Sequence, residues 1–379
     1  MTNLTKKAIK QDINEFQKKL EEIHPNPYKY ILKKDFHTLL ESKTKNVKSI
    51  RDLGLAIISV LPKLKDGHTQ LELSYDVFGA KSFMFQFKFF NDGYYLIKSS
   101  KTLSEFLGYK LTRINNFPID DIENIVTPLI PQENETSTKY YLSSKLMEPV
   151  ILDYLNIKKD ENIKLQLENQ KEKTSIEISP EDSKIKMISM LKNIPKVDES
   201  LKVRKPYWFK HMLDLKSFYF QYNECTEMED LSISEVIKIF KKSSLLNLII
   251  DLRNNKGGDS EVLKPLIEFL RKYKGKYKTF VLTGADMYSS AVINLIELSD
   301  IPNTISIGEI PHGNPTHYGE VEIFILPNSK LKVFSSSKLF RFKGYKLGEP
   351  FKPTHIVNTK IQDLLLGKDT QIEYLSNML

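Results

Sequence analysis

The sequence predicts an α/β protein whose carboxyl-terminal half contains a parallel sheet. Beyond Pro206, short apolar strands alternate with amphipathic helical segments, an order typical of parallel strands joined by right-handed helical crossovers. The chain has 379 residues, of which 40% are hydrophobic and 27% charged, so it can bury the cores of two or three packed units. We therefore expect a globular protein with smaller units ahead of the sheet.

Residues 1–78 are expected to form a helical unit. The first helix has apolar residues at steps of three and four and ends before His24-Pro25; these residues are Ile9, Ile13, Phe16, Leu20 and Ile23. A second apolar helix ends near Pro62. Asp66-Gly67-His68 then forms a turn, followed by a strand over residues 69–75. The unit thus delivers a histidine where it ends.

Residues 79–180 are expected to form a small mixed β unit. A hairpin over residues 83–98 turns at Asn91-Asp92-Gly93, and a strand ends near Ile114. A second hairpin follows over residues 163–178. The charged stretch 181–205 is predicted to be a linker.

The remaining residues, 206–379, carry the strand and helix alternation. The expected strands are 218–222, 245–250, 279–283, 304–307 and 321–325, and the expected helices are 232–242, 261–273 and 290–298. Ser232-x-x-Glu235 is a capping box, and Thr370-x-x-Glu373 is expected to cap the last helix.

Charge and cysteine content exclude several functional classes. The net charge is +8, but the basic residues are scattered among acidic ones, which argues against a nucleic-acid partner. No apolar run approaches a bilayer span and no leader is seen, so we expect no membrane partner and a cytoplasmic location. Cys225 stands alone, and the histidines lack zinc-site spacing, so neither a metal nor another cofactor is expected.

Two adjacent glycines follow the buried strand 245–250. Gly257 and Gly258 lie between this strand and the start of a helix, where unpaired N–H groups can bind an anion or an oxyanion. The motif of a phosphate-binding loop is not present. A tight turn, in which the glycines only relieve backbone strain, is the alternative.

Ser289 and Ser290 stand where a later strand passes into a helix. A hydroxyl there lies near the positive end of the helix dipole, with a backbone N–H beside it, which suits an activated nucleophile. An ordinary helix-capping serine is the alternative. His68 is the histidine in a glycine turn and a candidate base, and its rivals are His312, His317 and His355.

Taken together, these segments resemble the carboxyl-terminal processing and tricorn-type serine peptidases, peptidase family forty-one. The matching motifs keep one order over most of the chain: H-P-N-P-Y at His24, D-G-H-T at Asp66, D-L-R-N-N-x-G-G at Asp251, Y-S-S-A at Tyr288, G-E at Gly308, H-Y-G-E at His317, L-P-N-S at Leu326 and G-K-D at Gly367. The resemblance implies a crotonase-like catalytic core over residues 206–379.

The resemblance also implies roles for individual residues. Ser289 is the implied nucleophile, the N–H of Ser290 is one oxyanion donor, and Gly257 or Gly258 supplies the other. Relatives with a Ser-Lys dyad carry the lysine 25 positions after the serine, where this chain has Asn314, so the dyad is excluded. The tricorn-like arrangement remains, with His68 as the general base.

The carboxylate that orients the base is expected to be Glu349. Tricorn-like relatives place a glutamate near 60 residues after the serine, and Glu349 lies at that distance from Ser289. Glu309 and Glu320 are the substitutes. The stretch 108–119 looks like the core of a PDZ-like domain, which in relatives docks peptide ends, although Asn116 stands where relatives usually have glycine.

The sequence therefore predicts a serine endopeptidase that cuts polypeptides through an acyl-enzyme on Ser289. A homodimer is expected because relatives often assemble. Two alternatives are an inactive relative that binds a ligand or peptide, and an acyl transferase or cyclase that uses the same nucleophile.

Overall fold

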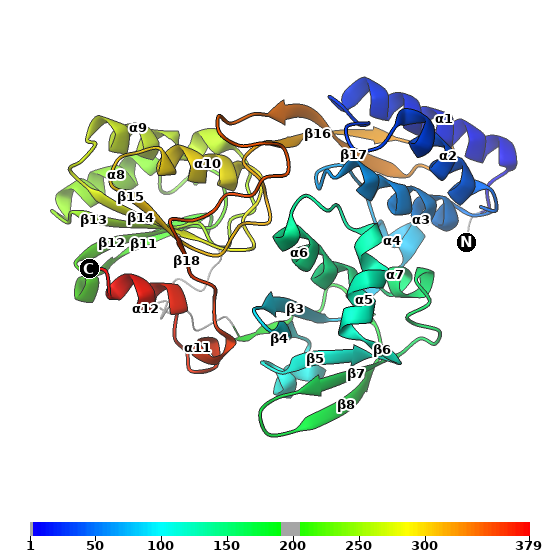
Figure 1. The fold of residues 1–379 in the computed structure, drawn as a ribbon, viewed down its shortest axis with the longest axis horizontal. Coiled ribbons are helices and arrows are strands. Elements are labelled where there is room, and N and C mark those ends of the chain that lie inside the picture. The colour runs from blue at the N-terminus through cyan, green and yellow to red at the C-terminus, as the bar shows by residue number, and fades with distance from the viewer. Residues whose placement is uncertain (1–2, 191–204) are drawn as a thin grey trace. The chain divides into compact units, whose positions relative to one another are not determined.

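The computed structural model describes residues 3–190 and 205–379 and divides the chain into two compact units (Figure 1). The first unit comprises Met1–Phe89, Gly93–Ser189 and Thr316–Arg341. The second comprises Phe90–Asp92, Met190–Pro315 and Phe342–Leu379. The hairpin that begins at Thr316 thus packs with the amino-terminal helices, although its sequence lies within the expected carboxyl-terminal core.

The first unit begins with three helices. They are α1 (Lys6–Ile23), α2 (Lys33–Thr44) and α3 (Ile50–Val60), and a 3-10 turn, Leu61–Leu64, follows α3. Ser49 and Asp52 close a capping box at the start of α3. The first and third helices agree with the expected ones. The largely polar α2 was not predicted, because it has few apolar residues with which to mark a helical face.

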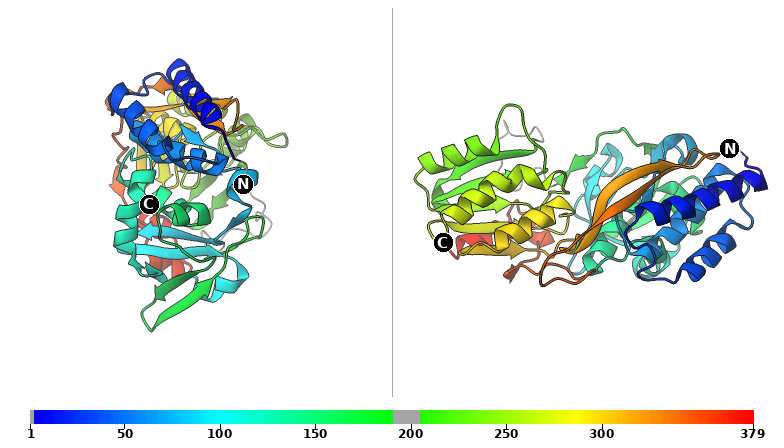
Figure 2. Two further views of the ribbon diagram at one scale, coloured as in Figure 1. Left: turned by 90° about the vertical axis from the view of Figure 1, so that its right-hand side faces the viewer. Right: turned by 90° about the horizontal axis from the view of Figure 1, so that it is seen from above.

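A three-stranded antiparallel sheet packs against these helices. Its order is β1 (Gln70–Leu71), β17 (Lys332–Phe340) and β16 (His317–Ile325). The β16–β17 hairpin, orange in Figure 2, runs beside α1, and the Phe16 and Phe324 rings lie 6.3 Å apart. The strand expected over residues 69–75 is therefore shorter than predicted, since Tyr75 already begins the one-turn helix α4 (Tyr75–Phe78).

The first unit also contains an antiparallel sheet in the order β10-β4-β5-β7-β8, with β3 paired to β4 and β6 paired to β5. Its strands are β3 (Phe85–Phe90), β4 (Gly93–Ser99), β5 (Lys110–Ile114), β6 (Phe117–Pro118), β7 (Ile163–Glu168), β8 (Lys173–Ile178) and β10 (Ile188–Ser189). The associated helices are α5 (Ile119–Val126), α6 (Glu135–Lys145) and α7 (Pro149–Tyr154), which share its hydrophobic core. Both predicted hairpins are present.

Part of the predicted linker 181–205 is structured. Glu181–Asp182 forms β9, which pairs with β2 (Lys81–Ser82), and Ile188–Ser189 is β10. Residues 191–204 lie outside the described residues.

The second unit is built on a six-stranded sheet in the order β11-β12-β13-β14-β15-β18. The strands are β11 (Tyr207–Met212), β12 (Ser217–Tyr222), β13 (Asn247–Asp251), β14 (Lys278–Thr283), β15 (Thr304–Gly308) and β18 (His355–Ile356). From β12 onward all neighbours are parallel, as the strand and helix alternation predicted. The edge strand β11 is antiparallel to β12 and was not predicted.

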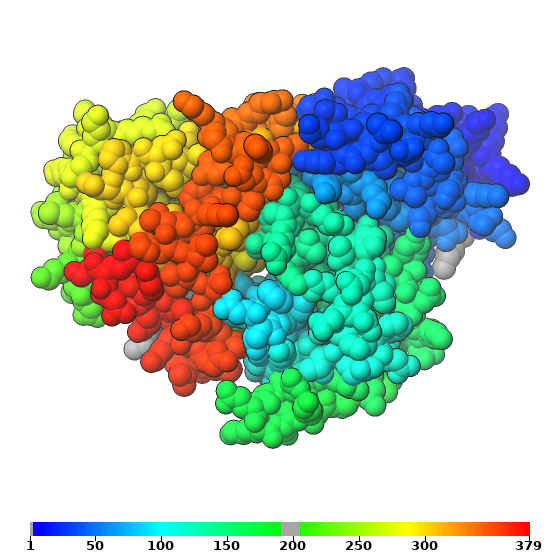
Figure 3. All heavy atoms as spheres, viewed as in Figure 1, coloured from blue at the N-terminus to red at the C-terminus, as the bar shows by residue number. Residues whose placement is uncertain are grey.

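Helices cover both faces of this sheet. One face packs against α8 (Ile233–Lys242), α9 (Lys264–Lys272) and α10 (Ser290–Ser299), and the other packs against α12 (Thr370–Ser376). Residues of alternate orientation on β13 divide between the two cores: Leu248 and Ile250 face α8–α10, whereas Ile249 packs with Leu375 of α12. In the space-filling view, the carboxyl-terminal segment, in red, lies at the surface of this unit (Figure 3).

Two predicted helix starts need correction. Asp369, not Thr370, caps α12, because its carboxylate accepts the N–H groups of Gln371 and Ile372. The helix expected from residue 261 begins as a 3-10 turn, Ser260–Leu263, before α9. The short α11 (Ile361–Leu365) precedes α12.

None of the helices in residues 3–190 and 205–379 is long and apolar enough to cross a bilayer.

Candidate active site

Ser289 occupies a strained turn between β14 and α10. Its backbone has φ 51° and ψ −130°, and a positive φ is uncommon for a residue with a side chain. Such conformations cost on the order of 1–3 kcal/mol and cluster at functional sites. The Ser289 side chain makes no capping hydrogen bond to the helix, although it is the N-cap residue. The alternative of an ordinary capping serine is therefore wrong.

The neighbouring Ser290 has a different role. Its hydroxyl is buried and donates to the carbonyl of Gly258 at 2.6 Å, which ties the head of α10 to the glycine loop. This bond leaves Ser289 as the candidate nucleophile of the pair. The backbone N–H of Ser290, at the first turn of α10, donates to no acceptor in the described part of the chain.

The glycine loop lies directly against the serine turn. Gly257 has φ +105°, and a Cβ there would lie 2.9 Å from Cβ of Ser289 and 3.0 Å from the backbone nitrogen of Ser290. No larger residue fits without moving the serine turn. At Gly258, a Cβ would lie 2.4 Å from the carbonyl oxygen of Cys225. The close approach of three backbone segments explains why both positions are glycine.

The two glycine amides are not equivalent. The N–H of Gly257 donates to Oδ1 of Asn255 at 2.8 Å, and Nδ2 of Asn255 donates to the carbonyl of Tyr222 at 3.0 Å. Within residues 3–190 and 205–379, the N–H of Gly258 has no acceptor. Of the two predicted oxyanion donors, Gly258 is the one whose amide is available. Asn255, which the sequence did not single out, determines which amide is available, because its side chain accepts the N–H of Gly257.

A buried ion-pair network anchors the strand end that leads into the glycine loop. Arg253 contacts Oδ2 of Asp251 at 2.6 Å and Oδ1 of Asp369 at 2.8 Å, and the Tyr219 hydroxyl donates to Asp251 at 2.6 Å. Burial acts to raise the pKa of Asp251, but the Arg253 charge, together with hydrogen bonds from Arg253 and the Tyr219 hydroxyl, lowers that pKa. Since Asp369 also caps α12, the carboxyl-terminal helix is linked to this loop.

His312 and Glu309 fix the loop between β14 and Ser289. Nδ1 of His312 donates to the carbonyl of Ala285 at 2.7 Å, and its ring stacks on Tyr288 at 4.7 Å. The buried Glu309 accepts the N–H of Ala285 at 3.0 Å and that of Thr359 at 3.2 Å. Both side chains are engaged in holding backbone, so the structure gives them a supporting role.

Three further candidates from the sequence, one histidine and two glutamates, make contacts of their own. His355 is on β18, where Nδ1 contacts the Tyr374 hydroxyl at 3.1 Å. Glu349 is exposed, and its carboxylate accepts the N–H of Lys346 at 3.0 Å. Glu320 belongs to the first unit, is exposed on β16 and pairs with Lys338 at 3.2 Å.

His68 belongs to the first unit, whereas Ser289 belongs to the second. The His68 ring stacks on His317 with centroids 5.6 Å apart. Burial, with a contribution from His317, lowers the pKa of His68 to about 4, while the Asp66 charge and a hydrogen bond to the Tyr318 backbone act to raise it. The imidazole is therefore neutral at pH 7 and able to accept a proton.

Asp66 organises the turn that carries His68. Its Oδ1 accepts the backbone N–H of His68 at 2.9 Å and lies 3.8 Å from Nδ1 of the same histidine. Oδ2 accepts the hydroxyls of Thr69 at 2.5 Å and Ser336 at 2.7 Å. Burial acts to raise the pKa of Asp66, but hydrogen bonding, led by His24, and the nearby histidines lower it to about 2. Asp66 is thus a buried carboxylate anion.

His24 is the fourth donor to Asp66, and sequence reasoning gave it no role. The N–H of Asn26 donates to Nδ1 of His24 at 3.1 Å, so the neutral ring carries its proton on Nε2. Nε2 then donates to Oδ2 of Asp66 at 3.2 Å. The H-P-N-P-Y motif, noticed only as part of a resemblance, was the signal for this contact.

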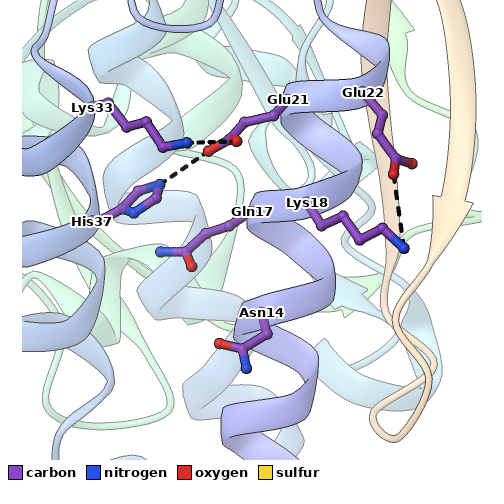
Figure 4. A pocket seen from close by; sticks show the side chains of 7 residues that line it. All are labelled: Asn14, Gln17, Lys18, Glu21, Glu22, Lys33 and His37. Atoms are coloured by element: carbon purple, nitrogen blue, oxygen red, sulfur yellow. Dashed lines mark hydrogen bonds and ion pairs between the residues drawn. The ribbon is translucent and has the colours of Figure 1, made fainter.

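A shallow groove between α1 and α2 contains Glu21, the partner of the tyrosine that ends this motif (Figure 4). Glu21 lies between Lys33, at 2.7 Å, and His37, at 3.3 Å. The Tyr28 hydroxyl donates to Glu21 at 2.7 Å and contacts His37 at 3.0 Å. These contacts hold the segment that presents His24 to Asp66.

Comparisons with known proteins agree with this arrangement of elements. No protein-family model and no curated protein sequence matches the chain. Among solved structures, mature CPAF complexed with lactacystin has a TM-score of 0.72 at 12% identity, covering 98% of this chain and 97% of that one. A serine-to-alanine mutant of CPAF has a TM-score of 0.69 at 12% identity, with 98% and 96% covered.

A photosystem II D1 C-terminal processing protease has a TM-score of 0.51 at 11% identity, covering 99% of this chain and 98% of that one. At such identities the likeness establishes the fold. The resemblance to peptidase family forty-one that the motifs indicated is confirmed at this level, since the chain has the mixed α/β fold of these peptidases.

Proposed function

We propose that the protein is a serine endopeptidase that hydrolyses polypeptides through an acyl-enzyme on Ser289. The observation that carries the proposal is the serine turn of the second unit. A non-glycine residue is held at positive φ at the head of a helix, its hydroxyl does not cap the helix, and the glycine loop packs against it. The fold shared with CPAF and the processing protease supports a peptidase.

In the proposed mechanism, His68 takes the proton of the Ser289 hydroxyl as its oxygen attacks the peptide carbonyl. The resulting oxyanion accepts the N–H groups of Gly258 and Ser290, which have no other acceptor among the described residues. His68 then donates the proton to the leaving amine, and the peptide C–N bond breaks. Water, deprotonated by His68, hydrolyses the acyl-enzyme and restores the Ser289 hydroxyl.

For the carboxylate partner of His68 we retain Glu349, proposed from its spacing to Ser289. Asp66 is a second candidate, because its Oδ1 lies 3.8 Å from Nδ1 of His68 and its charge raises the pKa of that ring. Glu309 and Glu320 are less suitable, since both oxygens of Glu309 accept backbone N–H groups and Glu320 pairs with Lys338, whereas Glu349 accepts a backbone N–H through Oε2.

We also propose the finer domain assignments. The parallel strands β12–β15 with α8–α10 support a crotonase-like core, to which residues 206–379 contribute apart from the 316–341 hairpin. The antiparallel sheet with α5 supports a PDZ-like unit within residues 79–180. A homodimer and a cytoplasmic location are part of the proposal, the latter supported by a single cysteine, Cys225, which is buried and free.

The test is labelling with a fluorophosphonate, followed by mapping of the modified residue and assay of unfolded casein. Ser289→Ala should abolish labelling and lower kcat/KM by about 10³-fold or more. Ser299→Ala is the matched control, because Ser299 lies at the other end of α10, where its hydroxyl donates to the carbonyl of Leu295, and this variant should retain labelling. Equal cleavage by the Ser289→Ala protein contradicts the proposal. Product masses distinguish hydrolysis, which adds one water per cut, from acyl transfer.

A further inference from the structure

A pocket opens in the first unit beside the turn that carries His68. Its cavity volume is about 50 Å³, which is small compared with a pocket for a whole ligand and suits part of a single side chain. Most of the lining is aliphatic. It comes from α3 and the 3-10 turn after it, from β1 and the residues just beyond it, and from the turn at residues 129–131, and it includes Ile58, Leu61, Leu71, Leu73 and Leu129. Tyr141 and Lys145 add polar atoms to its wall.

One edge of β1 borders this pocket and has no partner strand in the described part of the chain. On its inner edge, Leu71 stands opposite Val333, and the next residue, Glu72, donates its N–H to Lys332 at 3.0 Å. Hydrogen-bonded positions alternate along an antiparallel pair, so the N–H and C=O of Leu71 point away from β17.

Leu71 combines a low exposure of the whole residue with unpaired backbone groups. Leu71 is only 6% exposed, yet within residues 3–190 and 205–379 neither its N–H nor its C=O has a hydrogen-bond partner. Buried backbone groups are almost always paired. An unpaired donor and acceptor on one residue at a strand edge match the hydrogen bonds that an added extended chain supplies.

The outer edge of β1 lies close in the chain to His68, the candidate base. Leu71 follows His68 by three residues, so their Cα atoms lie at most about 11 Å apart. An extended peptide covers that distance in about three residues. A chain paired with Leu71 therefore reaches the neighbourhood of the imidazole.

We propose that an extended segment of the substrate polypeptide adds to the outer edge of β1, pairs with the backbone N–H and C=O of Leu71, and inserts one aliphatic side chain into the pocket. The proposal rests on the peptidase function and names how its substrate is held. Asp66 also lines the pocket, but its carboxylate already accepts four hydrogen bonds from the protein, so the pocket selects its occupant mainly by apolar contact.

Binding is measured with the full chain carrying Ser289→Ala, so that peptides stay intact. The probes are fluorescein-labelled Ala-Ala-Xaa-Ala-Ala peptides with blocked ends, where Xaa is Gly, Val, Leu or Glu, followed by fluorescence anisotropy. The Leu peptide should bind about 10- to 100-fold more tightly than the Gly peptide. N-methylation of the residue that pairs with Leu71, found by methylating each position in turn, should weaken binding about tenfold.

A pocket variant and a matched control complete the design. Leu73 lines the pocket, so the larger ring of Leu73→Phe should fill it and remove the preference for Leu over Gly. Glu72→Phe adds the same ring to the neighbouring residue, which does not line the pocket, and should retain the preference. Near-UV circular dichroism shows whether Leu73→Phe folds. If it does not fold, the proposal is still tested by comparing the Leu peptide with the Gly peptide and the methylated peptides with the unmethylated one.

The outcomes separate this inference from the proposed function. Cleavage that depends on Ser289, together with equal binding of all four peptides or a preference for Glu, overturns the inference and leaves the peptidase. Selective, methylation-sensitive binding of the Leu peptide without cleavage by the unmodified protein supports the inference and removes the peptidase function.

Discussion

Replacing Gly257 with alanine should impair the nucleophile without disrupting the fold. The added Cβ would lie 2.9 Å from Cβ of Ser289, 3.0 Å from the nitrogen of Ser290 and 3.1 Å from the carbonyl oxygen of Tyr288. Ordinary Cβ contacts begin near 3.4 Å, so the serine turn must move by about 0.5 Å. Catalytic groups are held to about that tolerance, and a 1 Å displacement costs about 100-fold in rate. We expect a loss of about 10- to 100-fold.

Gly275→Ala provides a matched control. Gly275 also has a positive φ, +84°, but a Cβ there meets nothing within 4 Å. Both substitutions carry backbone strain on the order of 1–3 kcal/mol, so both should lower the melting temperature by several degrees. Only Gly257→Ala should slow the reaction of Ser289.

The assay is the second-order rate of fluorophosphonate labelling, with thermal unfolding of each variant measured in parallel. Labelling reports on the serine alone and requires no knowledge of the natural substrate. If Gly257→Ala folds and labels at the unmodified rate, the glycine loop does not position Ser289. If Gly275→Ala loses labelling equally, strain rather than the local contact is responsible.

The remaining predictions concern the base and the buried ion pairs. Because the pKa of His68 is lowered to about 4, kcat/KM should stay flat from about pH 7 to 5 and fall only below that; an acid limb at the ordinary histidine value of 6.5 contradicts this. Asp66→Asn should lower the pKa of His68 further, since the Asp66 charge raises that pKa, and NMR titration of the ring measures the shift. Glu349→Gln should lower kcat while leaving folding intact. Because the folded-state pKa of Asp66 is about 2, its contribution to stability is present above its ordinary value of 3.8 and is lost as the pH falls toward 2, which urea unfolding at several pH values measures. Asp369→Asn removes a buried charged partner of Arg253 but keeps a side-chain oxygen that can cap α12, and should cost about 3 kcal/mol in the free energy of unfolding.

Local patterns in the sequence determined much of the second unit. Continuous apolar strands and amphipathic helices specify which segments form layers, because the hydrophobic period is a local property. The capping box at Ser232 behaved as predicted for the same reason, since all its contacts lie within three residues. The polar helix α2 and the edge strand β11 have weaker periodicity and depend on what packs against them.

Only the tertiary structure decided how the candidate site residues are used. The resemblance implied Ser289 as the nucleophile, and the structure adds a physical reason to prefer it, a hydrogen bond from the Ser290 hydroxyl to Gly258, 32 positions away. Gly257 and Gly258 look alike in the sequence, and Asn255 distinguishes their amides through a side-chain contact. The contact of His24 with Asp66 joins residues 42 positions apart. The sequence alone predicted the order of most of the elements and the residues that are candidates for catalysis. The hydrogen-bond partners were decided by the fold, because chain segments distant in sequence become neighbours only when the core forms.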